Sequence, residues 1–160
     1  MVDERMEQNL TDFETILKEK GTLVYRNTGT SMMPLLRQNR DLMVIRKRPE
    51  GRLNRLDAVL YKRDKQYILH RILKVRENDY VICGDHQYRR EYGVTDDQIL
   101  GVLSGVIRDG ETIGVKDFRY QAYVHLWCDL FYLRAAILAL KDYGRRAWRK
   151  IKRLFSHNAE

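Results

Sequence analysis

The alternation of apolar and polar positions divides the chain into a helical start, a β-rich middle and a helical end. Over residues 3–19, apolar side chains recur every three or four positions between charged ones, which predicts a helix with one apolar stripe. Over residues 23–115, short β-rich runs alternate with turn-prone segments, which predicts antiparallel hairpins that form a small barrel or folded sheet. The runs are LVYR, DLMVIRK, LDAVLY, QYILHRILKV, DYVIC and ILGVLSGVI.

The helical pattern returns after Lys116, in a segment that is apolar over residues 120–140 except at four positions. The length of this segment suits a bilayer. Asp129 and Arg134 lie near its middle, and each charge costs about 2.5 to 3.5 kcal/mol at the centre of a membrane, which disfavours independent spanning. The sequence is compatible both with a segment that crosses a membrane and with one that lies on its surface.

Positive charge is concentrated after this segment. The whole chain has a net charge of +8, of which residues 141–155 contribute +6, since they hold seven basic residues and one aspartate. On a helix, Trp148, Ile151 and Phe155 share an apolar arc, whereas the basic residues, Arg149 among them, occupy the other side. This pattern is typical of a helix that lies in an anionic membrane interface. The alternatives are a solvated helix packed on the sheet and a tail that binds nucleic acid, which no recognised motif supports.

The remaining composition describes one ordered globular domain with an extension. A chain of 160 residues that is 44% hydrophobic and 32% charged can bury a core and lacks the bias of disordered proteins. Cys83 and Cys128 lack the clustered spacing of a zinc site, so we expect buried, reduced thiols and no metal. MVDERMEQNL lacks the basic and apolar segments of a secretory signal peptide, so we expect none there. We assign residues 1–116 to the β-rich domain and residues 117–160 to a helical region for membrane association.

One serine and one histidine stand in settings that suit catalysis. Ser31 lies in TGTSMMP, where Gly29 permits an unusual backbone angle and Pro34 fixes the chain direction, so the turn can present a hydroxyl in a defined position. His70 lies in an apolar strand, where it is either the base that a serine needs or a satisfied core histidine. A carboxylate such as Asp85 could orient the imidazole, which would complete a catalytic triad.

The order of these segments resembles the signal peptidase family of serine proteases, in the branch that uses histidine as the base. The resemblance covers about residues 5–110 and depends on the order and spacing of several short motifs rather than on any one of them. It implies the β-rich signal peptidase fold. The motifs are GTSMMP, RDLMVIRK, LDAVLY, LHRIL, GDH and DDQILGVLSGVI.

The resemblance implies a role for each matched residue. Ser31 would be the nucleophile, and its backbone N–H would stabilise the oxyanion. His70 would be the general base, and Asp85 would be its acidic partner. The family binds its substrate as an added β-strand with small side-chain pockets, and we expect Met32 or Met33 to line that groove unless they pack the core. This chemistry implies neither a metal nor an organic cofactor.

Several departures from the family pattern bear on function. Gly29 stands where many relatives have a hydroxyl residue that helps to stabilise the oxyanion, and its loss would lower the rate. His86 follows the Gly-Asp pair where asparagine is common, so it is an alternative base or a neighbour that tunes Asp85. Arg40 and Leu56 replace glycines in turns, which we interpret as altered loops. Family members typically carry an N-terminal membrane anchor, whereas the apolar and basic segments here are C-terminal.

These observations lead to the hypothesis of a membrane-associated serine endopeptidase that removes a leader or signal segment from a precursor at a bacterial cell membrane. Its partners would be a peptide or precursor protein and an anionic membrane surface, rather than nucleic acid. One alternative is a non-catalytic adaptor of the same fold that binds peptides at a membrane surface. Another is a self-cleaving regulator of the SOS-repressor type, although that type uses a lysine base and carries an N-terminal DNA-binding domain. The sequence does not specify the natural substrate or the oligomeric state.

Overall fold

The computed structural model describes residues 13–156, with the side chains of residues 13–149. The first part of the predicted N-terminal helix, residues 3–12, lies outside the described residues. The side chains of Ile151 and Phe155, which we expect to contact a membrane, also lie outside them.

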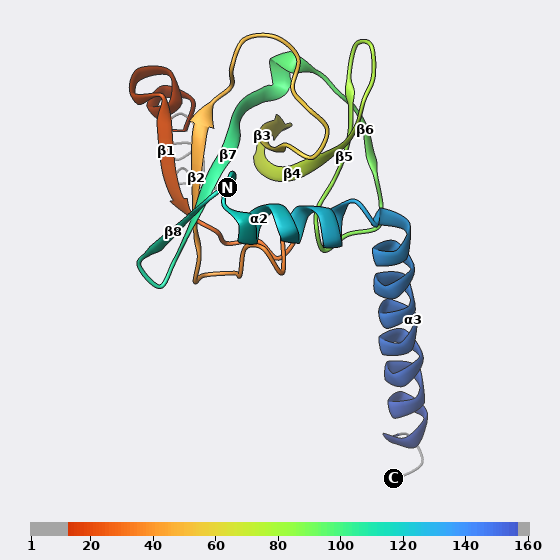
Figure 1. The fold of residues 1–160 in the computed structure, drawn as a ribbon. Helices are drawn as coiled ribbons and strands as arrows, with labels where there is room; N and C mark the ends of the chain where they lie inside the picture. Colours follow the sequence, from red (N-terminus) through yellow and green to blue (C-terminus); the bar gives the residue numbers. More distant parts are fainter. Residues whose placement is uncertain (1–12, 157–160) are drawn as a thin grey trace, which may run out of the picture.

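Eight antiparallel strands form one sheet in the order β1-β2-β7-β3-β4-β5-β6, with β8 paired to β7 (Figure 1). In the described part of the chain β1 and β6 are the two ends of the sheet and do not pair with each other. The prediction of a mainly β fold with a folded antiparallel sheet is therefore confirmed, and the sheet is open rather than closed. The strands are β1 (Thr22–Arg26), β2 (Leu42–Lys47), β3 (Ala58–Arg63), β4 (Gln66–Val75), β5 (Tyr80–Cys83), β6 (Glu91–Val94), β7 (Ile99–Arg108) and β8 (Glu111–Gly114).

The alternation of side chains along the strands creates two apolar cores. On β3, Leu60 packs into the first core, whereas its neighbours Val59 and Tyr61 pack into the second, because successive side chains point to opposite faces. The helix of residues 13–20 covers the first core and contributes Leu17 to it, in agreement with the predicted apolar stripe.

The C-terminal region forms a bent helical arm. Tyr120, Val124 and Cys128 are buried in the first core, so the start of the arm packs against the sheet and is part of the folded domain. Figure 1 shows α2 lying against the sheet and α3 projecting away from it. The arm consists of α2 (Phe118–Tyr123), a π-helical turn η2 (Val124–Cys128) and α3 (Phe131–Ser156).

The helices of the described residues were compared with the length and apolar content that a membrane span requires. No single helix among them meets both requirements. Two consecutive segments, Phe118–Cys128 and Phe131–Arg149, meet them together by length and composition, but they are bent by 70° at the break between them. After the break, the second half of the apolar segment and the basic tail form one continuous helix, α3.

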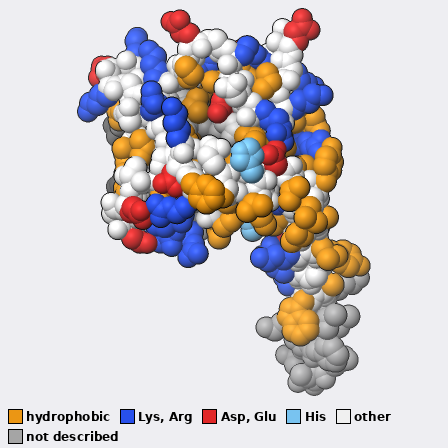
Figure 2. All heavy atoms as spheres, in the orientation of Figure 1, with side chains coloured by type: hydrophobic (Ala, Val, Ile, Leu, Met, Phe, Trp, Pro, Cys, Tyr) orange, Lys and Arg blue, Asp and Glu red, His pale blue; other side chains and the backbone are white. Residues whose placement is uncertain are grey.

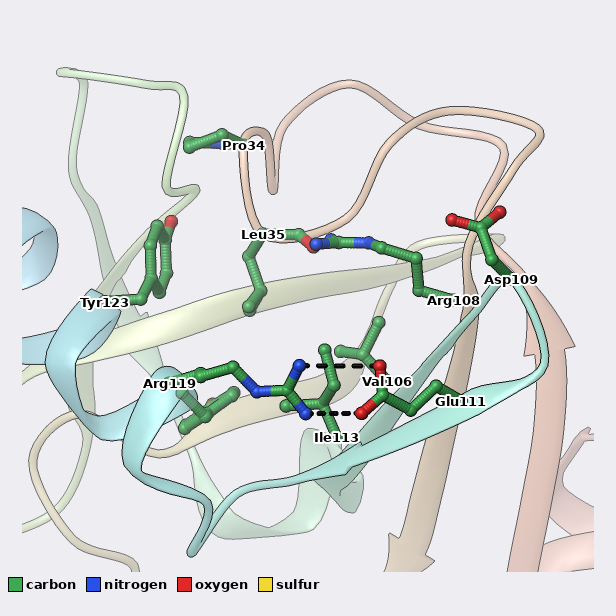
Figure 3. A pocket seen from close by; sticks show the side chains of 10 residues that line it. Pro34, Leu35, Val106, Arg108, Asp109, Glu111, Ile113, Arg119 and Tyr123 are labelled. Carbon is green, nitrogen blue, oxygen red and sulfur yellow. Dashed lines mark hydrogen bonds and ion pairs between the residues drawn. The ribbon is translucent and has the colours of Figure 1, made fainter.

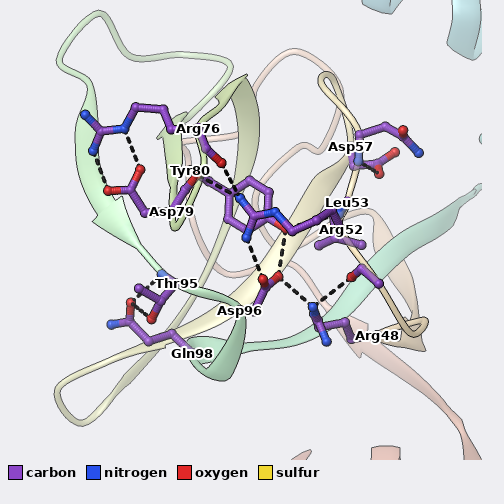
Figure 4. A network of polar contacts seen from close by, with 12 residues as sticks. Arg48, Arg52, Leu53, Asp57, Arg76, Asp79, Tyr80, Thr95, Asp96 and Gln98 are labelled. Carbon is purple, nitrogen blue, oxygen red and sulfur yellow. Dashed lines mark hydrogen bonds and ion pairs between the residues drawn. The ribbon is translucent and has the colours of Figure 1, made fainter.

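A polar network orders the turn that leads into β7, near the middle of the sheet (Figure 4). Asp96, in the short 3-10 helix η1 (Asp96–Gln98), accepts hydrogen bonds from Arg48 (2.6 Å), Arg52 (2.5 Å) and the Tyr80 hydroxyl (2.7 Å). Donors from separate parts of the chain thus converge on one carboxylate. Because this network includes no residue of the candidate site, we interpret it as structural.

Candidate functional site

Ser31 lies half-buried in the turn between β1 and β2. The buried side chain of Asn27 holds this turn, since its Nδ2 donates to the carbonyls of Gly29 (2.8 Å) and Leu36 (3.4 Å). The Leu36 N–H in turn donates to the Met32 carbonyl (3.0 Å). These hydrogen bonds give the serine a fixed position, which the sequence around it predicted.

The two methionines after Ser31 differ in their surroundings. Met32 is only 2% exposed and packs into the first core beside Leu35 and Leu36. The prediction that it lines a substrate groove is therefore corrected, because a side chain this deeply buried cannot contact a peptide on the surface. Met33 is half-buried, and it stays a candidate for substrate contact.

The loop after β5 contacts the backbone of the Ser31 turn. The backbone N–H of His86 donates to the Ser31 carbonyl (2.7 Å). A Cβ atom built on Gly84 would lie only 2.7 Å from the same carbonyl oxygen. Glycine at this position therefore allows the two segments to approach each other.

The same loop begins beside the strand that carries His70. Arg71 on β4 pairs with Cys83 on β5, and continuing this antiparallel register by one residue puts Gly84 opposite His70. The loop that contacts Ser31 thus starts one residue after the strand pair that holds Arg71, the neighbour of His70 in the chain. Within the described residues, the Ser31 hydroxyl makes no hydrogen bond to His70, and catalytic contacts in free enzymes are often long.

Glu91 at the start of β6 is the carboxylate that contacts His70. Its Oε1 lies 3.1 Å from His70 Nδ1, and the Tyr61 hydroxyl lies 3.3 Å from the same nitrogen. Glu91 is itself held, because its Oε2 accepts hydrogen bonds from Tyr61 (2.9 Å) and Arg63 (2.7 Å). A carboxylate beside Nδ1 favours the tautomer with the proton on Nδ1, which leaves Nε2 as the basic nitrogen.

Burial determines the charge of this histidine. His70 is 3% exposed, and this burial lowers its pKa, while the nearby Glu91 carboxylate raises it. Burial has the larger effect, so the pKa of His70 lies below its usual range. The imidazole is therefore neutral at neutral pH, which is the form that can accept a proton from a serine.

The role predicted for Asp85 is corrected. Its carboxylate is fully buried and forms a bidentate ion pair with Arg71, with nitrogen–oxygen distances of 2.8 and 2.7 Å. It also accepts a hydrogen bond from the Tyr123 hydroxyl (3.0 Å). Arg71 neutralises Asp85, and Glu91 occupies the position at His70 Nδ1 that we expected Asp85 to take. Asp85 is thus a structural residue of the site.

Asp85 also connects the helical arm to the loop that supports Ser31. The indole N–H of Trp127 donates to the Asp85 carbonyl (3.0 Å), and the Cys128 thiol lies 3.6 Å from its carboxylate. Arg134 on α3 is 2% exposed, and its guanidinium lies 3.8 Å from the Asp85 carboxylate. Burial raises the pKa of Cys128 to about 12. Both cysteines of the chain are free and buried, as the sequence predicted, and Cys128 is a packing residue.

A cavity of about 330 Å³ opens beside the Ser31 turn (Figure 3). Pro34 and Leu35 form one wall, and Tyr123 stands at one end. Arg119 and Glu111 face each other across it and are joined by an ion pair of 2.7 Å. Arg108 and Asp109 also line it, so the cavity combines apolar walls with four charged side chains.

Sequence reasoning missed Glu91 and the Asp85–Arg71 pair. Glu91 opens EYGV, a strand too short and polar to be recognised from its pattern.

Comparison of the chain with protein-family models and with curated proteins finds no match. Among the described residues, no group of three His, Cys, Asp or Glu side chains is arranged to hold a metal ion. The functional argument therefore depends on the geometry of the Ser31 and His70 segments.

Replacing Gly84 by alanine should disturb the Ser31 turn, since the added carbon would meet the Ser31 carbonyl oxygen at 2.7 Å. We expect a loss of about 1 to 3 kcal/mol in the free energy of unfolding, measured by urea denaturation, together with a fall in any Ser31-dependent activity. Gly29→Ala is the matched control in the same turn, because its Cβ would meet nothing nearer than Asn27 Oδ1 at 3.9 Å. Equal effects from the two substitutions would contradict the close approach of Gly84 to Ser31.

Proposed function

We propose that the chain is a serine endopeptidase that removes a leader or signal segment from a precursor peptide. The observation that supports this most strongly is the setting of His70, which is buried, is held at Nδ1 by Glu91 and neighbours the loop that supports Ser31. The carboxylate beside Nδ1 favours the tautomer that leaves Nε2 to act as the base. The motif order that resembles signal peptidases adds to this argument.

The proposed mechanism assigns one task to each group. Ser31 Oγ attacks the scissile carbonyl carbon while His70 Nε2 takes the hydroxyl proton. The protonated His70 then gives this proton to the leaving amine, and a water molecule hydrolyses the resulting ester by the reverse proton path. Glu91 is a positioning residue that orients the imidazole and stabilises its charged form. The backbone N–H of Ser31 makes no hydrogen bond within the described residues, so it is available to the oxyanion.

An extended peptide is the substrate that the surroundings of Ser31 favour. Among the described strands, β1 pairs only with β2, and Ser31 follows β1 by five residues. A peptide added along the free edge of β1 would run toward the serine, with backbone hydrogen bonds that do not depend on its sequence. The cavity beside Pro34 and Leu35 would then receive one of its side chains.

A non-catalytic peptide-binding adaptor is the second candidate. The specific observation in its favour is that the Ser31 hydroxyl and His70 are not hydrogen-bonded in the described part of the chain. The adaptor would use the same free edge of β1 and the same cavity to hold an extended peptide. It would leave the peptide uncut.

The test is intact-mass analysis of a precursor peptide with an Ala-x-Ala junction, incubated with the full chain and anionic vesicles. We expect a product cut at the junction with the wild type and none with Ser31→Ala. Ser104→Ala is the matched control, because the Ser104 hydroxyl donates to the Val44 carbonyl (3.1 Å) within the sheet, and it should cleave like the wild type. Cleavage by Ser31→Ala at the wild-type rate would exclude the proposed chemistry. Binding without cleavage by the folded wild type would favour the adaptor.

A further inference from the structure

Five large apolar side chains of the helical arm are exposed, three of them within α3. We call them the leucine stripe. Leu133, Ile137 and Leu140 are spaced by four and three positions within α3, so they share one side of that helix. Leu126 in η2 and Leu130 in the turn before α3 are exposed just ahead of them in the chain. The five are Leu126 (72% exposed), Leu130 (51%), Leu133 (58%), Ile137 (49%) and Leu140 (74%). Figure 2 shows hydrophobic side chains gathered where α3 leaves the body of the protein.

The leucine stripe is not the side by which the arm packs on the protein. That side carries Phe131, Arg134 and Leu138, which are 9%, 2% and 6% exposed. Contiguous exposed apolar patches of this kind are rare on soluble monomers and usually mark an interaction surface. The arm therefore uses one side to hold the domain and presents the other for a partner.

We propose that the leucine stripe binds an anionic lipid surface. The exposed side chains that follow it on α3 include Lys141, Arg145, Arg146 and Arg149, and anionic headgroups would neutralise their charge. A second copy of the chain in parallel would instead bring the same positive charges together. Tyr143 and Trp148 are 73% and 67% exposed on the same helix, and such aromatic side chains prefer the membrane–water interface.

The structure also favours an arm that lies on the membrane over one that crosses it. Arg134 and Leu138 are buried against the protein, so this part of α3 cannot be surrounded by lipid. The bend of 70° between Phe118–Cys128 and Phe131–Arg149 likewise separates the two segments that together have the length of a span. An amphipathic helix in the plane of the interface satisfies both observations.

The test is flotation of the full chain with phosphatidylglycerol vesicles, compared with phosphatidylcholine vesicles, at low and high salt. We expect the wild type to float with the anionic vesicles and to dissociate as salt rises. Ile137→Glu should lower the partition coefficient by at least about tenfold more than Ala139→Glu does. Ala139 is the matched control, because it is exposed on the same helix but about 200° around its axis, and both variants add one negative charge.

Four outcomes would overturn the proposal. The first two are failure of the wild type to float and equal losses of vesicle binding in both variants. The third is retention of the wild type on vesicles after a carbonate wash, which releases surface-bound proteins. The fourth is a dimer in light scattering that Ile137→Glu dissociates. The last of these would show that the leucine stripe binds a second copy of the chain. Ile137 is exposed, so thermal unfolding should show that both variants fold. The readout is independent of the proposed peptidase activity, so the two proposals can fail separately.

Discussion

Substitution of His70 by alanine is expected to lower kcat/KM for precursor cleavage by about a thousandfold, because in the proposed mechanism His70 accepts the Ser31 proton. The loss should equal that of Ser31→Ala, and the double variant should lose no more than either single one, since the two groups act as a unit. Steady-state cleavage monitored by mass spectrometry measures the effect. Circular dichroism should confirm that His70→Ala keeps its fold.

His86→Ala is the matched control, because His86 lies in the loop beside Ser31 and is the alternative base that the sequence offers. It contributes its backbone N–H to the Ser31 carbonyl, which alanine retains. We therefore expect its kcat/KM to stay within about threefold of the wild type, well below the loss that removal of a catalytic base causes. A thousandfold loss in His86→Ala with activity retained in His70→Ala would exchange the roles of the two histidines.

The pH profile provides a second measure of the same site. Burial lowers the pKa of His70, so kcat/KM should rise with pH through a midpoint below the usual value of about 6.5 and then level off. The Glu91 carboxylate raises this pKa, and Glu91→Gln should therefore move the midpoint to lower pH while reducing the plateau. An unchanged midpoint in Glu91→Gln would show that Glu91 does not act on His70.

Asp85→Ala is expected to cost about 3 to 5 kcal/mol in the free energy of unfolding. Asp85 and Arg71 are both fully buried, and Arg134 is 2% exposed beside them. Removing the carboxylate would leave two guanidinium groups in the interior without a compensating charge. Urea denaturation measures the loss, which corresponds to a fall of about 10 °C in Tm for a chain of this size.

Asp142→Ala is the matched control for Asp85→Ala. Asp142 pairs with Arg145 at 2.6 Å on the surface of α3, where 34% of the Asp142 side chain and 58% of the Arg145 side chain are exposed. Exposed pairs contribute little, so we expect a much smaller loss than in Asp85→Ala. A comparably small loss in Asp85→Ala would mean that the buried ion pair is absent.

Most of the fold could be predicted from the sequence, because it depends on local patterns. The strand predicted over QYILHRILKV matches β4, and five other apolar runs correspond to strands. The pattern failed for β6 and β8, whose sequences EYGV and ETIG contain few apolar residues. These strands form because neighbouring strands offer them hydrogen-bond partners, and such tertiary support leaves no signal in their own residues.

The candidate site could be predicted only in part, for a similar reason. Ser31 and His70 stand in distinctive local settings, a glycine-containing turn and an apolar strand. The partner of His70 depends on which carboxylate β6 brings to β4 from across β5, and chain order does not show this. Asp85 lies in a Gly-Asp motif that resembles a family signature, yet its carboxylate pairs with the guanidinium of Arg71 and not with His70. The sequence could single out His70 and Asp85 as candidates, but it could not show which carboxylate contacts the histidine.

The contacts between the arm and Asp85 can form only late in synthesis. Synthesis proceeds from the N-terminus, so the sheet, with His70 and the His86 loop, leaves the ribosome before Trp127 and Arg134 do. Until these residues emerge, the Asp85 loop lacks the indole that binds its carbonyl and the apolar cover of the arm. The Ser31 turn, which depends on this loop, would therefore gain its full support only when the leucine stripe has also been made. A nascent chain would thus complete the proposed catalytic site and the proposed membrane-binding surface together.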